Sequence, residues 1–174
     1  MIEYKFLTKE EFLPILKTYR SIVFTENNDI HLEDFYTEEE AKRQSELSAL
    51  CSTQYRIYLT AWDKEKIAGW SWGYQVDGKE FYMCNSAVMP EYRRSGIYTE
   101  LLNRVITKAT HDGFMEITSK HHADNNAVII PKLKHGFVIK GFEINPRFGL
   151  MLNLVRYKNS DILHVHNQRT GFKK

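Results

Sequence analysis

The sequence predicts an α+β domain in which a mixed, mainly antiparallel sheet is flanked by helices. Strand-like runs of alternating apolar residues are found near the start, in the middle and near the end of the chain, and runs with the 3.6-residue period of amphipathic helices separate them. An Asp77-Gly78 pair between two strand-like runs is typical of a hairpin turn. The expected order of elements is β-α-α-β-β-β-α-β-α-β-β.

The first third of the chain is predicted to form one strand and two helices. Residues 2–7 alternate as a strand does, and a helix is expected from there to about Val23. Thr8 and Thr37 are each followed three residues later by a glutamate, which is the pattern of a capping box at a helix start. The second helix is mostly polar and is expected at the surface. The polar segment 25–36 between the two helices has no regular pattern.

The middle of the chain is predicted to form an antiparallel meander. Three runs, 55–62, 67–76 and 81–89, combine aromatic and β-branched residues with polar ones. A helical stripe of apolar residues follows over 97–109, and a short strand is expected at 114–119. A strand, a helix and a second strand in this order imply a parallel crossover step.

The last part of the chain is predicted to form one short helix and a closing hairpin. Asn125 or Asn126 is suited to begin the helix and Gly136 to end it, while Pro131 is expected to kink or shorten it. The strands of the hairpin are expected at 137–144 and 150–157. We therefore predict a single domain over residues 1–158, followed by a polar, partly disordered tail at 159–174.

Composition excludes several classes of function. The 24 basic and 22 acidic residues give a net charge of +2, which is too even for nucleic acid or an anionic membrane as the main partner. The two cysteines, Cys51 and Cys84, have no metal-ligand spacing and favour a reducing compartment over a disulfide framework. The first residues do not resemble a signal peptide, and no apolar run has the length of a membrane span. We expect a cytoplasmic protein that binds no metal.

The most informative segment is residues 88–102. An apolar strand ends at Pro90, a basic turn with Arg93 and Arg94 follows, and a helix begins just after Gly96. Because the first N–H groups of a helix have no partner within it, this arrangement favours an anion site.

This turn resembles the pyrophosphate-binding signature of the GNAT superfamily of N-acetyltransferases, Gln/Arg-x-x-Gly-x-Gly/Ala. Arg93 stands at the Gln/Arg position and Gly96 at the first glycine, whereas Tyr98 replaces the usual Gly or Ala. A tyrosine is tolerated there if its side chain points outward, since the site uses backbone groups. Asn125, followed by Gly136-Phe137, is similar to the second landmark of the family.

The resemblance implies the GNAT fold and an acetyl-CoA-dependent transfer of an acetyl group to a primary amine of a small molecule or a protein. Acetyl-CoA and the amine acceptor are the expected partners, and the chain is expected to be a monomer or a homodimer. The residues implied in cofactor binding are Ser86, Ala87, Val88, Arg93, Arg94, Ser95, Gly96, Ile97, Tyr98, Thr99 and Asn125. The backbone N–H of Val88 is the implied donor to the oxyanion.

The residues that would move protons are less well defined. Many members of the family carry a tyrosine four residues before the second-landmark glycine, where this chain has Lys132. Lys132 could donate a proton to the leaving thiolate, contact a phosphate or face solvent. Candidates for the base are Glu80, Cys84, Asn85, His121, His122, Asp29, His31, Glu33 and Asp34.

One alternative function accompanies this interpretation. The missing tyrosine gives weight to a non-catalytic acyl-CoA-binding domain with a regulatory role. Trp70, Trp72 and Tyr74 are expected to pack in the core, although one of them, or Tyr82, could line an acceptor pocket. A P-loop nucleotide-binding protein is excluded because G-x-x-x-x-G-K-[ST] is absent.

Overall fold

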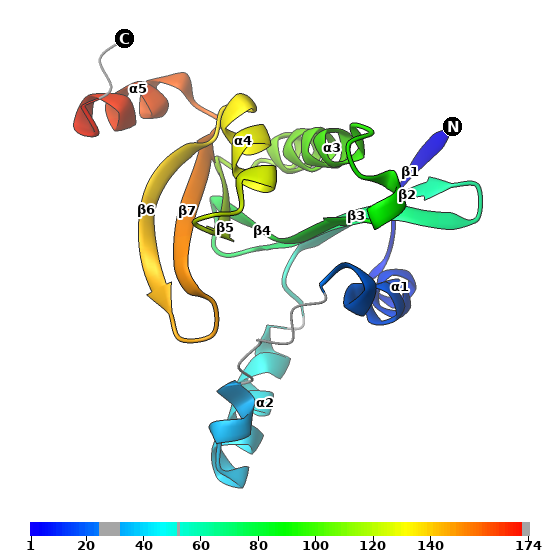
Figure 1. Cartoon of the computed structure of the whole chain (residues 1–174). Helices are drawn as coiled ribbons and strands as arrows, with labels where there is room; N and C mark the ends of the chain where they lie inside the picture. The colour runs from blue at the N-terminus through cyan, green and yellow to red at the C-terminus, as the bar shows by residue number, and fades with distance from the viewer. Residues whose placement is uncertain (25–31, 52, 172–174) are drawn as a thin grey trace.

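A seven-stranded sheet in the order β1-β2-β3-β4-β5-β7-β6 forms the centre of the molecule (Figure 1). The computed structural model describes residues 1–24, 32–51 and 53–171. The strands are β1 Ile2–Phe6, β2 Arg56–Asp63, β3 Lys66–Gln75, β4 Glu80–Val88, β5 Glu116–His122, β6 Val138–Asn145 and β7 Gly149–Tyr157. The helices are α1 Lys9–Val23, α2 Glu38–Leu50, α3 Ile97–His111, α4 Asn126–Lys134 and α5 Ser160–Arg169.

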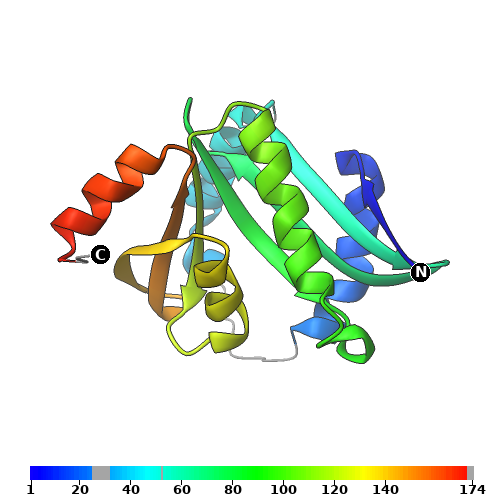
Figure 2. The same ribbon diagram turned by 90° about the horizontal axis from the view of Figure 1, so that it is seen from above.

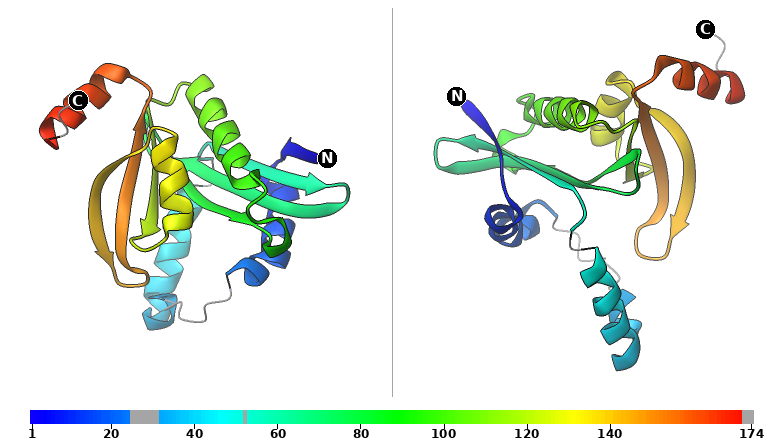
Figure 3. Two further views of the ribbon diagram at one scale, coloured as in Figure 1. Left: turned by 45° about the horizontal axis from the view of Figure 1, so that its top comes forward. Right: turned by 180° about the vertical axis from the view of Figure 1, so that it is seen from behind.

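The sheet is mixed and mainly antiparallel, as predicted. Only β4 and β5 pair in parallel, and α3 is the crossover between them. The two strands pair only where Glu80–Tyr82 lie beside Glu116–Thr118. Beyond that point β4 continues along β3, and β5 continues along β7. Figures 2 and 3 show the two strands separating, which leaves a V-shaped opening in the sheet.

Helices α1 and α3 cover opposite faces of the sheet (Figure 1). The apolar stripe of α3 is buried in the larger core cluster, and Phe12 of α1 is buried in the smaller one with Tyr58 and Trp70. Both predicted capping boxes are present, because the side chains of Thr8 and Thr37 each accept from the backbone N–H of the glutamate three residues on.

Three local features differ from the expectation. The turn after β3 spans residues 76–79 rather than two residues, because Asp77 Oδ1 accepts from the N–H groups of both Lys79 and Glu80 at 2.8 Å. Strand β5 starts two residues later than predicted and extends to His122. The segment expected as a polar tail contains α5, which the side chain of Asn159 caps and which lies against β7.

None of the helices in the described ranges is both long and apolar enough to cross a membrane.

Candidate functional site

The loop between β4 and α3 places six backbone N–H groups in a row without acceptors. Arg94 (φ +62°) and Gly96 (φ +84°) both adopt left-handed backbone conformations. Gly96 is the N-cap of α3 and supplies no side chain to cap it. The N–H groups of residues 94–99 therefore have no hydrogen-bond partner within the described part of the chain. At the positive end of a helix, such a row favours a phosphate-like anion.

The side chains of this loop are held in place by the end of β4. Arg93 Nε lies 3.4 Å from the carbonyl oxygen of Val88, and Ser95 Oγ donates to the carbonyl of Tyr92 at 2.5 Å. Tyr98 does not point outward as the resemblance required: its ring packs against the core under α3, and burial raises the pKa of its hydroxyl. Tyr98 therefore fits at the position where the family signature has Gly or Ala because its ring is taken up by the core.

A β-bulge shapes the strand that precedes the loop. Trp72 pairs with Asn85 and the next residue of β3, Gly73, pairs with Met83, so Cys84 is an extra residue in β4. A bulge bends its strand. This one lies just beyond Tyr82, where β4 and β5 stop pairing.

Beyond the bulge, β4 has no strand partner among the described residues on the side of the opening. Met89 donates its N–H to the carbonyl of Ala68 in β3 at 3.0 Å. Successive residues of a strand direct these groups alternately, so the N–H of Val88 and the backbone groups of Ser86 point away from β3, toward the opening. The resemblance implied that Ala87 binds the cofactor, but its carbonyl faces β3 and not the opening. This carbonyl lies so close to Gly69 that a Cβ on Gly69 would meet it at 2.6 Å.

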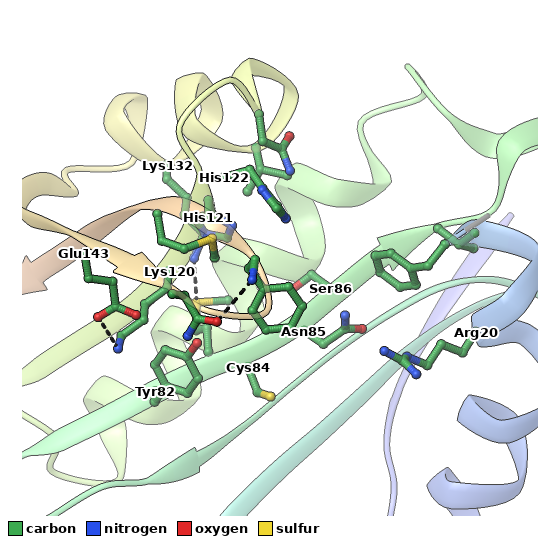
Figure 4. A pocket seen from close by; sticks show the side chains of 18 of the residues that line it. Arg20, Tyr82, Cys84, Asn85, Ser86, Lys120, His121, His122, Lys132 and Glu143 are labelled. Carbon is green, nitrogen blue, oxygen red and sulfur yellow. Dashed lines mark hydrogen bonds and ion pairs between the residues drawn. The ribbon is translucent and has the colours of Figure 1, made fainter. Parts of the chain in front are cut away.

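A cavity of about 710 Å³ occupies the opening (Figure 4). It is lined by residues from β4, β5, the end of α1, α4 and the β6–β7 hairpin. The lining residues that the sequence predicted are Tyr82, Cys84, Asn85, Ser86, Arg93, His121, His122, Asn125 and Lys132. Asn125 stands at the N-cap of α4 but makes no capping hydrogen bond with its side chain.

Other predicted candidates lie elsewhere. Glu80 accepts a hydrogen bond from Thr118 Oγ1 at 2.6 Å where β4 and β5 still pair, and it does not line the cavity. Glu33 and Asp34 lie in a short 3-10 turn and do not line it either. Asp29 and His31 are outside the described residues. Trp70, Trp72 and Tyr74 do not line the cavity, and Trp70 is fully buried in the core.

The β6–β7 hairpin and β5 contribute an ion pair that the sequence did not reveal. Lys120 Nζ lies 2.7 Å from Glu143 Oε2, and this contact lowers the pKa of the Glu143 carboxyl. Within the described residues, Glu143 is the only carboxylate that lines the cavity. The sequence held no signal for it, because the alternation of Phe142, Glu143 and Ile144 predicts the apolar pair to be buried, whereas in the structure both apolar residues are exposed.

The two histidines differ in their surroundings. Burial, and then the charge of Lys132, lowers the pKa of His121 to about 3, so its ring is neutral. Its Nε2 lies 3.1 Å from Ser119 Oγ. His122 is exposed at the cavity and its ring meets that of Phe148 edge to face.

Lys132 is the most unusual group in the cavity. Its side chain is buried, with 1% of the residue exposed, so the solvent-facing interpretation is wrong. Its Nζ lies 3.5 Å from Met83 Sδ and 4.6 Å from the ring centroid of Phe137. In the described ranges no carboxylate forms an ion pair with it, and burial lowers its pKa to about 7. Burial also raises the pKa of the Cys84 thiol to about 11, which keeps it protonated.

Comparisons with known proteins identify the family of the chain. A model of the acetyltransferase (GNAT) family matches residues 21–137, which is most of the chain. The chain therefore belongs to the acetyltransferase (GNAT) family. No curated protein matches the sequence.

Several solved structures share the fold of this chain. The ribosomal-protein-S18-alanine N-acetyltransferase of Escherichia coli is 17% identical with a TM-score of 0.67, over 90% of this chain and 94% of that one. A GNAT family acetyltransferase from Elizabethkingia anophelis, solved with acetyl-CoA bound, is 16% identical with a TM-score of 0.65, over 90% and 97%. The IAA acetyltransferase of Bacillus cereus is 13% identical with a TM-score of 0.66, over 90% and 99%.

No group of three or more His, Cys, Asp or Glu side chains is placed to hold a metal ion within residues 1–24, 32–51 and 53–171.

Proposed function

We propose that this protein is an acetyl-CoA-dependent N-acetyltransferase that acts on a primary amine of a small molecule or a protein. One observation supports this most strongly: the free backbone edge of β4 leads directly into the row of free N–H groups at residues 94–99. A ligand with an extended polar arm that ends in a pyrophosphate fits both features at once. Coenzyme A is such a ligand.

The residues of the loop and of the cavity fit coenzyme A. The N–H groups of residues 94–99 are suited to bind the pyrophosphate, and Arg93 adds a positive charge beside them. The backbone groups of Ser86 are suited to pair with the pantetheine arm as an added strand, and the N–H of Val88 beside them stays available. Asn125 lines the same cavity with a side chain that is not used as a helix cap.

Direct attack of an amine on the thioester carbonyl needs a donor to the oxyanion. The N–H of Val88 points into the opening and can supply it. Glu143 is placed to attract the ammonium form of an acceptor, and the exposed His122 can carry its proton to solvent.

The leaving thiolate needs a proton donor. Lys132 takes this role in place of the tyrosine of other family members. With a pKa of about 7, it is protonated in roughly half of the molecules at neutral pH, and its ammonium is then a stronger acid than an exposed lysine.

Two measurements test the proposal. Acetyl-CoA should raise the melting temperature of the protein, and acetyl-CoA with a panel of primary amines should release free CoA and give an amide product that resists hydroxylamine. Stabilisation without turnover on any amine would favour the non-catalytic acyl-CoA-binding domain. No stabilisation by any acyl-CoA would refute both functions.

A matched pair of variants tests the placement of the donor. Gly96→Glu puts bulk and negative charge beside the free N–H groups and should abolish stabilisation by acetyl-CoA. Gly113→Glu makes the same change at another left-handed glycine, after the far end of α3, where a Cβ also meets nothing within 4 Å, and should leave it intact. Retained affinity in Gly96→Glu would refute the placement.

A further inference from the structure

The amine of Lys132 lies beside the part of β4 where its free edge begins. Lys132 Nζ contacts Met83 Sδ at 3.5 Å, and Met83 lies next to the bulged residue Cys84. If the pyrophosphate binds at residues 94–99, a pantetheine arm that runs along β4 past Val88 and then past Ser86 ends in this region. On the proposed function, the reactive end of acetyl-CoA and the amine of Lys132 therefore share one end of the cavity.

The surroundings of this amine favour its neutral, nucleophilic form. Met83 of β4 and Phe137, which follows α4, pack against it, and neither offers a negative charge. The titratable group of the cavity that the charge of Lys132 influences is His121 on β5, and its ring is neutral at neutral pH. Cys84 on β4 is also uncharged, but its pKa responds to Arg56 and Arg20 and not to Lys132. Burial thus leaves the ammonium with only the weak contacts to Met83 Sδ and the Phe137 ring and, in the part of the chain that the structure describes, with no carboxylate, and a desolvated lysine of this kind is a known type of nucleophile.

We infer that Lys132 is itself an acetyl acceptor: when no amine substrate is present, acetyl-CoA bound in the cavity acetylates Lys132 Nζ. This inference rests on the proposed function. The nitrogen lone pair attacks the thioester carbonyl, a C–N bond forms and the C–S bond breaks. The nitrogen loses one proton, and the departing thiolate gains one, so the products are Nε-acetyl-Lys132 and free CoA.

The modification removes the group that protonates the thiolate and adds volume to the same cavity. Acetylated protein is therefore expected to transfer acetyl groups more slowly. The amine acceptor competes with Lys132 for the same thioester, so the protein would be protected while acceptor is abundant and inactivated when it is scarce.

The test uses the full chain and acetyl-CoA that carries an isotope-labelled acetyl group, without acceptor. Intact mass and peptide mapping should show one labelled acetyl group on Lys132, stable to hydroxylamine. The labelling rate should rise about tenfold between pH 6 and pH 8, because the neutral fraction of an amine with a pKa of about 7 rises by that factor. Excess free CoA should suppress the labelling.

Three controls make the result decisive. Lys132→Met removes the amine and should abolish the label, whereas Lys120→Met removes the other cavity lysine and should retain it. Gly96→Glu should also lose the label, which separates acetylation by bound acetyl-CoA from random chemical acetylation. Label on Cys84, on Lys120 or on no residue, in protein that acetyl-CoA stabilises, would overturn this inference and leave the proposed function standing. Absence of stabilisation would overturn both.

Discussion

Replacement of Lys132 by methionine is expected to stabilise the protein, and by an amount that depends on pH. Burial lowers the pKa of Lys132 from its usual 10.5 to about 7. Each pKa unit corresponds to about 1.4 kcal/mol, so holding this ammonium in the folded protein costs about 5 kcal/mol below pH 7. Between pH 7 and 10.5 the unfolded chain binds more protons than the folded one, so the stability of the wild type rises with pH in this window.

Methionine is close to lysine in length and carries no charge, and at this position it would pack against Met83 and Phe137. Lys132→Met should therefore be more stable than the wild type by up to about 5 kcal/mol at pH 6, with the difference shrinking toward zero near pH 10.5. Urea unfolding followed by circular dichroism at pH 6, 8 and 10 measures this. Lys134→Met, an exposed lysine of the same helix, is the matched control and should show no such trend.

A Lys132→Met variant that is less stable than the wild type at pH 6 would contradict this prediction. So would a stability difference that stays constant with pH, because the charge of Lys132 would then be compensated in the folded state.

Three further predictions concern other parts of the molecule. Gly73→Ala should destabilise the fold by about 2 kcal/mol or more in urea unfolding, since its Cβ would lie 2.3 Å from the carbonyl oxygen of Tyr82; Gly78→Ala, in open space, should change little. Thr8→Ala should cost about 1 kcal/mol through loss of the capping box of α1, and an unchanged unfolding midpoint would contradict this. Glu143→Gln should raise KM for the amine but leave the Kd of acetyl-CoA unchanged. An equal rise in the two constants would mean that Glu143 supports the fold and does not contact the acceptor.

The features predicted correctly from the sequence are those that neighbouring residues determine. The capping boxes at Thr8 and Thr37 and the start of α3 just after Gly96 each depend on residues within a few positions. The crossover through α3 follows from element order and the handedness of chain connections. For these reasons the fold could be predicted without structural information, whereas the anion site at residues 94–99 stays a prediction.

The acceptor side of the cavity could not be predicted, because it forms by contacts between distant segments. Strand β7 inserts between β5 and β6, and this brings Glu143 to Lys120, 23 residues away in the chain. The burial of Lys132 depends equally on β4, since Met83 is 49 residues away. A lysine on a short helix carries no local sign that its amine is buried.

Helix α2 extends from the body of the molecule, and none of its residues is buried (Figure 1). Its 13 residues are held by the capping box at Thr37 and by surface pairs such as Arg43 with Glu46, which add only tenths of a kcal/mol. A helix of this length without tertiary packing is marginal in water. Amide hydrogens of α2 should therefore exchange with solvent before those of α3, and loss of helical circular dichroism should begin before the core unfolds. The domain is thus expected to unfold in two steps rather than as one cooperative unit.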